Sequence, residues 1–301
     1  MSGTRLIVLA PSRSASKDIA DRIGALFAKS DHLDVAKSGD RGLYGDLFEP
    51  VPIGWPAAAL TRQLDAGDAA GHAWLRADPA HFRAEPGNVR LLVCGDVGQT
   101  DDEAAQLHAA LAPIFGDEGF ELSVPHPHRW YLRAFAGNAS PDLPDLPSPE
   151  AALGGDLFEL WHESEITHRW RRLFNETQIV LAQHPVNQAR TQRGLPALNG
   201  LWFWGAGRWP ETVRTSLSHV CTRDALLAAF AMAAGIDLVV DELPAEADGW
   251  QRSLIDLRRH DDADKMLLTI LEQWHAGQLR ELEWRTREER WQLKRWHRWR
   301  F

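Results

Sequence analysis

The sequence predicts an α/β protein, and three observations support this class. A short apolar run near the start of the chain, Leu6 to Ala10, is typical of a buried strand, and a segment with helical periodicity follows it. Further apolar runs alternate with helical patterns along the rest of the 301 residues. The composition, with 44% hydrophobic and 25% charged residues, is ordinary for a folded globular chain. This length allows one large domain or two ordinary ones.

Residues 1–66 are expected to supply the N-terminal part of an α/β core. A strand is predicted from Arg5 to Ala10. The helix predicted after it has an apolar face made by Ile19, Ile23, Leu26 and Phe27. Asp34 to Trp55 is rich in Gly and Pro, which indicates an irregular segment. A second helix is predicted from Ala57 to Leu64.

Residues 67–136 are expected to form an α+β module. Strands are predicted at Ala73–Ala77 and Val89–Cys94. A helix is predicted at Asp101–Phe115, because Thr100 or Asp101 can cap its start and apolar residues recur along one side. Phe120–Val124 and Trp130–Phe135 are predicted to pair as a hairpin. The four prolines in residues 137–155 predict a linker or a long exposed loop.

Residues 156–260 are expected to complete the core, and residues 261–301 to form a C-terminal helix with a basic, Trp-rich tail. The predicted helices of the core are Glu165–Gln183, a short helix up to Arg193, and Thr222–Ala234. Its predicted strands are Gly200–Trp204, Asp237–Asp241 and Ser253–Leu257. The last helix is predicted to start near Asp261 and to continue through Leu282.

The composition excludes several classes of protein. The net charge of −9 argues against a protein that binds polyanions with its whole surface. Two cysteines, Cys94 and Cys221, form neither a disulfide framework nor a zinc spacing. No apolar run reaches the roughly 18 residues of a membrane-spanning helix. The N-terminal apolar run is shorter than that of a secretory signal, so we expect a cytoplasmic protein without a transmembrane segment.

Residues 198–210, L-N-G-L-W-F-W-G-A-G-R-W-P, combine three tryptophans with a Gly-Ala-Gly turn. Gly205 and Gly207 permit close approach, so the backbone N–H groups of this turn could bind an anion, with Arg208 adding charge. The alternative is a strand-terminating turn shielded by the tryptophan rings. Spacing alone favours this structural interpretation, since a G-x-G pattern is weakly specific.

Three further sets of residues have both a functional and a structural interpretation. His184 could be a general base or a ligand, or it could cap the preceding helix while Asn187 closes the turn. Arg76 and Asp78 could read a phosphate and a carboxylate, or form an ion pair. The loop His126–Arg129 could contribute to a metal site, or be a simple hairpin turn. The structural interpretation is favoured in each case.

Two segments near the C-terminus are also ambiguous. A divalent metal could bind the closely spaced His260, Asp261, Asp262 and Asp264. Acidic residues at a helix start also complement the helix dipole, and this second interpretation is favoured. The tail, which interleaves Trp291, Trp296 and Trp299 with basic residues, could contact single-stranded nucleic acid or a membrane surface, or could lie on the body of the protein.

Taken together, several motifs resemble the archaeal-type cofactor-independent phosphoglycerate mutases of the alkaline phosphatase superfamily. These motifs are G-H-A-W-L-R-A-D-P at residues 71–79, H-P-V-N-Q-A-R at 184–190, and N-G-L-W-F-W-G-A-G-R-W-P at 199–210. The chain is still more similar to a proteobacterial branch of this family that includes the E protein of the xanthomonad regulation-of-pathogenicity-factors cluster. The resemblance covers about residues 66–240. It implies a reduced alkaline-phosphatase-like core with an inserted α+β module and a C-terminal helical tail.

The resemblance also implies a ligand cleft, for which the candidate residues are Arg76, Asp78, His184, Asn187, Arg190, Asn199, Gly205, Gly207 and Arg208. The family's reaction uses a Ser nucleophile and two divalent metals, usually manganese or zinc, and here three of its motifs depart from the pattern. The first strand ends without an Asp-Gly turn, and P-I-G-W-P-A-A-A-L at residues 52–60 supplies no Ser or Asp. Arg258 stands about where a metal-binding His belongs.

The sequence therefore predicts a non-catalytic relative that acts as a regulatory or ligand-binding protein, because phosphoryl transfer by this route needs both the nucleophile and the metals. No cofactor is expected, and a phosphorylated small molecule or a protein is a possible partner. The alternative is a metal-dependent phosphoglycerate mutase or phosphatase with a rearranged site. Manganese or zinc would then be expected at His260, Asp261, Asp262 and Asp264.

Overall fold

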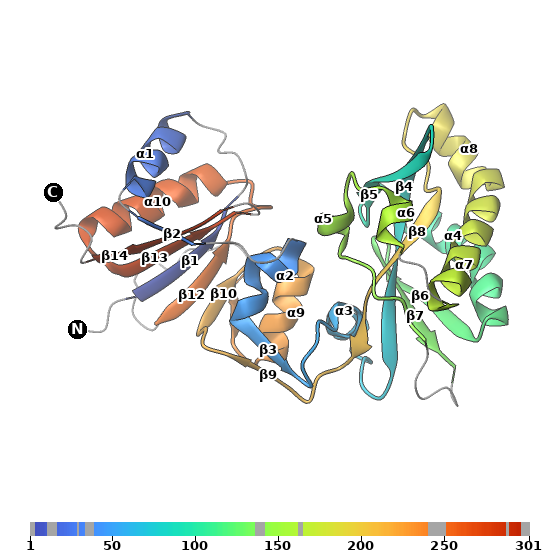
Figure 1. Ribbon diagram of the computed structural model, residues 1–301, viewed down its shortest axis with the longest axis horizontal. Helices are drawn as coiled ribbons and strands as arrows, with labels where there is room; N and C mark the ends of the chain where they lie inside the picture. Colours follow the sequence, from blue (N-terminus) through green and yellow to red (C-terminus); the bar gives the residue numbers. More distant parts are fainter. Residues whose placement is uncertain are drawn as a thin grey trace. The chain divides into compact units, whose positions relative to one another are not determined.

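The computed structural model describes residues 4–10, 17–28, 30–33, 39–135, 142–161, 165–239, 251–286 and 289–295 (Figure 1). The chain divides into two compact units, one made by residues 1–53 and 211–301 and the other by residues 54–210. An α+β unit is thus inserted into an α/β unit, and the predicted α/β class is confirmed. The inserted unit is longer than the 67–136 module expected from the sequence. The end of the strand predicted at 237–241, residues 136–141 and the tail beyond Arg295 lie outside the described residues.

A seven-stranded sheet, with the order β11-β10-β12-β1-β13-β14-β2, forms the centre of the first unit. Its strands are β1 (Thr4–Leu9), β2 (Asp31–Leu33), β10 (His219–Cys221), β11 (Asp237–Val239), β12 (Arg252–Asp256), β13 (Leu279–Arg285) and β14 (Arg290–Lys294). The five strands from β11 to β13 run parallel, β14 pairs antiparallel with β13, and β2 pairs antiparallel with β14. β1 lies between β12 and β13, which explains why its sequence is a continuous apolar run.

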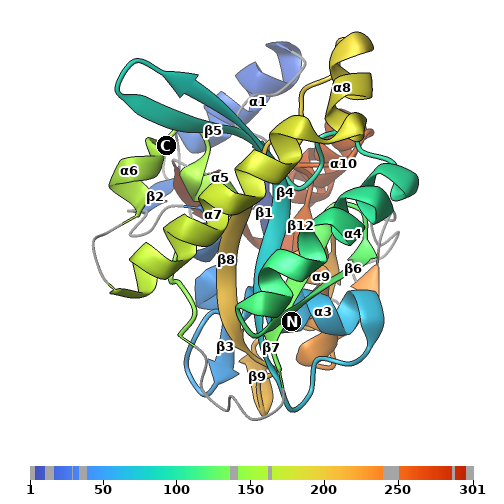
Figure 2. The same cartoon turned by 90° about the vertical axis from the view of Figure 1, so that its right-hand side faces the viewer.

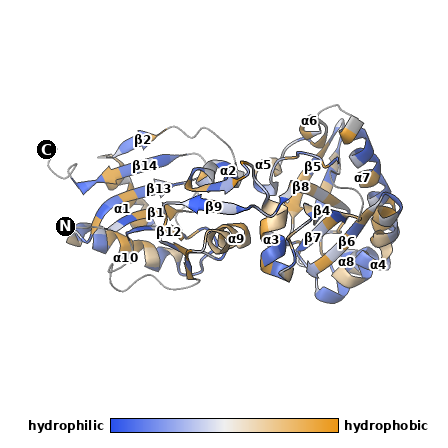
Figure 3. Ribbon diagram, turned by 90° about the horizontal axis from the view of Figure 1, so that it is seen from below, coloured by the Kyte–Doolittle hydropathy of each residue, from blue (hydrophilic) through white to orange (hydrophobic). Residues whose placement is uncertain are grey.

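Helices cover this sheet. The helices α1 (Lys17–Phe27) and α10 (Ala263–Ala276) share one apolar core with β1, β12 and β13, in which Ile23, Ile270 and Trp274 are buried. α9 (Ala225–Ala233), which connects β10 to β11, is apolar along most of its length (Figure 3). α2 (Gly39–Tyr44) and a 3₁₀ turn (Gly45–Leu47) lead into β3 (Phe48–Val51), which pairs with β9 (Thr212–Thr215) as a small second sheet.

The second unit contains an antiparallel five-stranded sheet built around one long strand. β4 (Ala73–Glu85) pairs with β5 (Asn88–Cys94), β7 (Arg129–Ala134) and β8 (Gly200–Arg208), and β6 (Phe120–His126) pairs with β7. The longer helices α4 (Asp101–Asp117) and α7 (Glu165–Gln183) lie side by side in front of the sheet (Figure 2). The remaining helices are α3 (Ala57–Ala66), α5 (Pro149–Ala152), α6 (Leu157–Leu160) and α8 (Pro185–Gln192).

The two faces of β8 show how the sheet is packed. The Phe203 ring contacts Phe115 of α4 and Trp170 of α7, with ring centroids 6.1 and 5.0 Å apart. Its neighbour Trp204 points to the opposite face, because successive side chains of a strand alternate. The close spacing of large rings in this segment therefore has a structural cause, since both faces of β8 are covered.

The prediction of a C-terminal helical tail is wrong beyond Ala276. α10 ends at Ala276, where Gly277, with a left-handed φ of 80°, is the C-cap, and residues 279–285 and 290–294 form β13 and β14. In the tail, Trp291 stacks on Phe27 with ring centroids 4.9 Å apart and an interplanar angle of 5°. This tryptophan thus packs on the body of its own unit. The expectation of an irregular segment at 34–55 is also wrong for residues 39–51, which form α2, the 3₁₀ turn and β3.

Candidate functional site

The Arg76–Asp78 pair lies inside the second unit, where the sheet of β4 and β8 encloses it. Arg76 and Asp78 are 4% and 1% exposed. The guanidinium donates to Asp78 Oδ1 from Nε at 2.9 Å and from Nη2 at 2.8 Å, and to Thr61 Oγ1 from Nη1 at 3.1 Å. The Trp204 indole N–H donates to Asp78 Oδ2 at 2.7 Å. The ion-pair interpretation fits this geometry, because each nitrogen of the guanidinium and each oxygen of the carboxylate already has a protein partner.

The electrostatics of this pair extend to a second pair beside it. Burial raises the pKa of Asp78, and Arg76 and Trp204 act against that shift. For Asp65, burial also opposes ionisation, but hydrogen bonds from Arg129 and Tyr131 outweigh it and hold the pKa below its usual value. Burial raises the pKa of Tyr131, whose hydroxyl donates to Asp65 Oδ2 at 2.5 Å. The charged groups of this network are therefore paired with one another, and their hydrogen bonds connect α3 to β4 and β7.

The glycines of the Gly-Ala-Gly segment permit close packing of β8 on α3, rather than a turn that ends the strand. β8 continues to Arg208, whose Nη1 donates to the Gly71 carbonyl at 3.3 Å. A Cβ on Gly207 would lie 2.6 Å from Pro56 Cβ, and a Cβ on Gly205 would lie 2.9 Å from Ala57 Cβ. Gly205 also has a φ of 68°, which favours glycine. The start of α3 therefore packs directly against the Gly-Ala-Gly segment.

We expect Gly207→Ala to destabilise the protein by about 1–3 kcal/mol, the usual range for overpacking a close contact. The added methyl would overlap Pro56, whose ring cannot rotate away. Gly116→Ala, in α4, is the matched control, since the added methyl would have no atom of another element within 4 Å and alanine favours helix. Urea denaturation of both variants measures the difference. A Gly207→Ala midpoint equal to that of Gly116→Ala would contradict this packing.

The H-P-V-N-Q-A-R segment joins α7 to α8 through internal hydrogen bonds. His184 is the N-cap of α8, where its Nδ1 accepts from the Val186 N–H, so it caps the following helix and not the preceding one as expected. Asn187 closes the junction by donating to the Leu181 and Leu198 carbonyls at 2.7 and 2.9 Å. Asn199 bonds both backbone groups of Phe82. Asn187 thus connects the α7–α8 junction to the residues just before β8, and Asn199 connects those residues to β4.

Arg190 has the most internal partners of the candidate residues. Its side chain is fully buried, and it donates to Glu103 Oε2 at 2.6 Å and to the carbonyls of Val97, Gly98 and Pro196 at 2.6, 3.3 and 2.9 Å. The guanidinium thereby connects α8 to the capping box of α4, in which Thr100 and Glu103 bond each other's backbone N–H groups. A ligand would have to displace these bonds to reach Arg190.

The acidic segment at residues 260–264 lies at the start of α10, and the structure describes all five of its residues. Asp262 is the N-cap of this helix, and Asp261, whose side chain is 90% exposed, pairs with Arg223 at 2.8 Å. His260 Nδ1 accepts from the Asp262 N–H at 3.3 Å. Within the described part of the chain, no three His, Cys, Asp or Glu side chains converge as a metal site. The structure therefore does not assemble His260, Asp261, Asp262 and Asp264 around an ion.

A polar cluster that the sequence motifs do not mark lies at the carboxyl edge of the seven-stranded sheet. Asp256 ends β12, and Thr222 and Asp224 follow β10. The chain leaves β10 toward β11 and leaves β12 toward β13, in opposite directions across the sheet. In open α/β sheets, ligands bind at the carboxyl ends of the strands where the connections diverge in this way. Polar residues placed directly after apolar strand runs were the available sequence signal.

The carboxylate at this edge is already paired. Arg258 donates to Asp256 Oδ1 from Nε and to Oδ2 from Nη2, both at 2.8 Å, and Thr222 Oγ1 donates to Oδ2 at 2.9 Å. Asp224 caps α9 by accepting from the Leu227 N–H. Asp256 and Asp224 are 3% and 6% exposed. These carboxylates are the oxygen ligands that a divalent ion would use at this edge, and Asp256 is bound on both oxygens by protein donors.

A second charged group lies at the end of β13. Arg285, which is 2% exposed, donates to Glu283 Oε1 at 2.8 Å and to Asp46 Oδ1 at 2.6 Å. Arg290 binds the same two carboxylates. Burial opposes ionisation of Asp46, but its hydrogen bonds and charge interactions with the two arginines lower its pKa overall. The carboxyl edge is thus lined by arginine–carboxylate pairs.

Comparison with known proteins gives a partial likeness. The chain matches no protein-family model. It is 27% identical over 111 residues to the probable 2,3-bisphosphoglycerate-independent phosphoglycerate mutase of Geobacter sulfurreducens. The match covers 36% of this chain and 27% of that protein, so it spans about a quarter of the curated relative's length.

Two solved structures are similar at low identity. The cofactor-independent phosphoglycerate mutase of Thermoplasma acidophilum is 14% identical, with a TM-score of 0.42, over 96% of this chain and 88% of that one. A protein of Pyrococcus horikoshii is 11% identical, with a TM-score of 0.44, over 97% of this chain and 87% of that one. The chain is therefore an α/β protein that is similar, over 36% of its sequence, to a probable 2,3-bisphosphoglycerate-independent phosphoglycerate mutase.

Proposed function

We propose that this chain is a phosphoglycerate-mutase-like protein that does not transfer phosphoryl groups and acts by binding a ligand or a partner. The observation that carries the proposal is the bidentate contact of Arg258 with Asp256. A guanidinium fixed on both oxygens of this buried carboxylate supplies the positive charge that a divalent ion would otherwise bring to it. Arg258 also stands about where the resemblance implies a metal-binding histidine.

The start of α3 supports the same proposal. The resemblance implies a serine nucleophile shortly before residue 66, and α3 begins with Pro56 as its N-cap and three alanines, Ala57, Ala58 and Ala59. An alanine side chain cannot form a phosphoenzyme, because it has no nucleophilic atom. Gly205 and Gly207 pack so closely on this helix start that neither position has room for a Cβ.

We expect the purified 301-residue protein to leave 2- and 3-phosphoglycerate unconverted, with Mn²⁺ or Zn²⁺ added. Phosphorus-31 NMR resolves the two compounds and measures the conversion directly. A cofactor-independent phosphoglycerate mutase in the same buffers serves as the positive control. Metal-dependent conversion that follows the protein through successive purification steps would overturn the proposal.

The alternative, a mutase or phosphatase with a rearranged site at His260, Asp261, Asp262 and Asp264, has a distinct outcome in the same assay. It requires metal-dependent turnover that is lost in Asp262→Asn or Asp264→Asn. For the proposed binding protein, the ligand class we propose is a phosphorylated small molecule or a protein. The likeness to the proteobacterial branch stays a prediction.

A further inference from the structure

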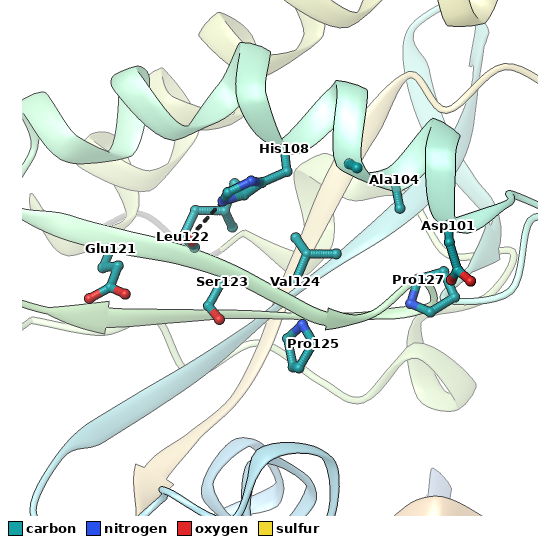
Figure 4. Close-up of a pocket in the computed structure, with 10 residues that line it drawn as sticks. Asp101, Ala104, His108, Glu121, Leu122, Ser123, Val124, Pro125 and Pro127 are labelled. Atoms are coloured by element: carbon teal, nitrogen blue, oxygen red, sulfur yellow. Dashed lines mark hydrogen bonds between the residues drawn. The ribbon is translucent and has the colours of Figure 1, made fainter.

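The turn between β6 and β7, residues 126–129, is an element that the proposed function does not use. His126 pairs with Arg129 at the end of the hairpin, so the hairpin-turn interpretation of this loop is confirmed. The turn lies at one end of an open groove of 560 Å³ between α4 and β6, where Pro127 is a lining residue together with Asp101 (Figure 4). The conformation of the turn therefore affects the shape of this end of the groove.

The Pro127 carbonyl holds the turn in place. It accepts from Gln99 Nε2 at 2.8 Å and from the Trp130 indole N–H at 2.9 Å. Gln99 belongs to the loop before α4, where it also donates to the Gly95 carbonyl at 2.7 Å and accepts from the Val97 N–H at 2.9 Å. One carbonyl thus connects the turn to the loop before α4.

A second hydrogen bond, inside the turn, depends on the charge of His126. The Nδ1 atom of this imidazole accepts from the His128 N–H at 3.1 Å. A ring nitrogen that carries a hydrogen cannot accept, so this bond requires the neutral imidazole with its hydrogen on Nε2. Protonation of Nδ1 places two N–H groups against each other and breaks the bond. Because Pro127 is the residue between the two histidines, the direction of its carbonyl depends on this bond.

The charged surroundings of His126 also favour its neutral form. The titratable and charged groups that face it are Arg129 and His128 of the turn, Arg76 of β4 and Asp65 of α3. Both oxygens of Asp65 already accept from Arg129, at 2.6 and 2.7 Å. Burial, followed by the charge of Arg129, lowers the pKa of His126, and Asp65 only partly offsets these effects. The stabilisation by neutral His126 is therefore present above its unfolded pKa and is lost as the pH falls through its lower folded pKa.

His128 responds to acid in the opposite sense. Its Nε2 lies 3.6 Å from Asp96 Oδ1, so protonation of this histidine strengthens an ion pair with the loop before α4. The Asp96 side chain is 71% exposed, and solvent screens the pair. His128 thus supplies a matched control, because it is a histidine of the same turn with the opposite expected effect.

We propose that the β6–β7 turn is a pH-sensitive switch, which stays bound to the loop before α4 while His126 is neutral and detaches when His126 takes up a proton. Detachment breaks the bonds of the Pro127 carbonyl to Gln99 and Trp130, and it widens this end of the groove. This proposal concerns the second unit alone and stands whether or not the protein transfers phosphoryl groups.

The test is hydrogen exchange of the 301-residue protein, followed by NMR between about pH 7.5 and about pH 5, the range in which histidine titrates. After correction for the intrinsic exchange rate, the protection of the Val97 and His128 N–H groups should fall about threefold or more, since uptake of one proton allows up to about tenfold per pH unit. The protection of the Leu111 N–H, in the middle of α4, should stay constant. Constant protection of Val97 and His128 over this range would overturn the proposal.

Two variants assign the effect to one histidine, with the Val97 N–H as the common probe. In His126→Asn, the side-chain oxygen can accept the same N–H two residues ahead but takes up no proton in this range. We expect this variant to keep its protection at both ends of the pH range, whereas His128→Asn should retain the pH dependence of the parent protein. Circular dichroism confirms that both variants fold. A pH dependence that persists in His126→Asn, or that disappears in His128→Asn, would contradict the role of His126.

Discussion

Arg76→Ala should be among the most destabilising substitutions in the chain, at about 3–5 kcal/mol, because it leaves the buried Asp78 without its counter-charge. The Asp78 side chain is 1% exposed, so bulk solvent does not compensate its charge. The substitution also removes the contacts of the cation with the rings of Tyr131 and Trp204, whose centroids lie 5.3 and 5.1 Å from it. Urea denaturation at neutral pH measures the loss.

The same strand supplies the control. Arg83 and Glu85 have the same residue spacing on β4 and bond at 2.6 Å, but the Arg83 side chain is 60% exposed. Arg83→Ala should therefore cost less than about 1 kcal/mol. The comparison tests burial, because the substituted residue, the spacing and the strand are the same, although the partner carboxylate is Glu85 in place of Asp78. Similar losses for the two variants would mean that the Arg76–Asp78 pair does not support the fold of the second unit.

The elements that could be predicted from the sequence are those determined by nearby residues. α4 was predicted together with its cap, since Thr100 and Glu103 form the capping box within one helical turn. The hairpin of β6 and β7 was predicted for a similar reason, because the loop between its strands is short. α7 and α8 were located by Pro185 and Gly194, which act on their own neighbours.

Features that depend on distant residues could not be predicted in this way. β13 is a strand because residues 279–285 pair with β1, at the other end of the chain, whereas its local sequence of alternating charge and apolar residues also fits a helix. The burial of Arg76 and Asp78 depends on Trp204, which lies 126 positions after Asp78. Asp256 could not be predicted as part of a cluster, because a single carboxylate at the end of an apolar run forms no motif. Its pairing with Arg258 is visible only in the structure.

The family motif itself illustrates this difference. Arg76, Asn187, Arg190 and Asn199 were expected to border a ligand cleft because they belong to the motifs of the resemblance. In the structure, Arg76 donates to the Thr61 hydroxyl of α3, and Asn187 donates to the Leu181 carbonyl of α7. Arg190 donates to the Val97 carbonyl, and Asn199 accepts from the Phe82 N–H of β4. Such residues maintain the shape of the second unit whether or not any chemistry remains, so their presence cannot by itself indicate an active site.

Arg190→Ala should destabilise the protein by about 3–5 kcal/mol, since it removes a fully buried cation from Glu103 and takes a donor from the carbonyl of the buried Val97. The control is unusually close, because Arg193 binds the other oxygen of the same carboxylate but is 53% exposed. Arg193→Ala should cost less than about 1 kcal/mol. Hydrogen exchange should locate the loss of Arg190→Ala at α8 and the start of α4, which this side chain joins. Equal losses of stability in the two variants would contradict this prediction. They would mean that either arginine alone can neutralise Glu103, and that the three carbonyl contacts of Arg190 do not stabilise the junction.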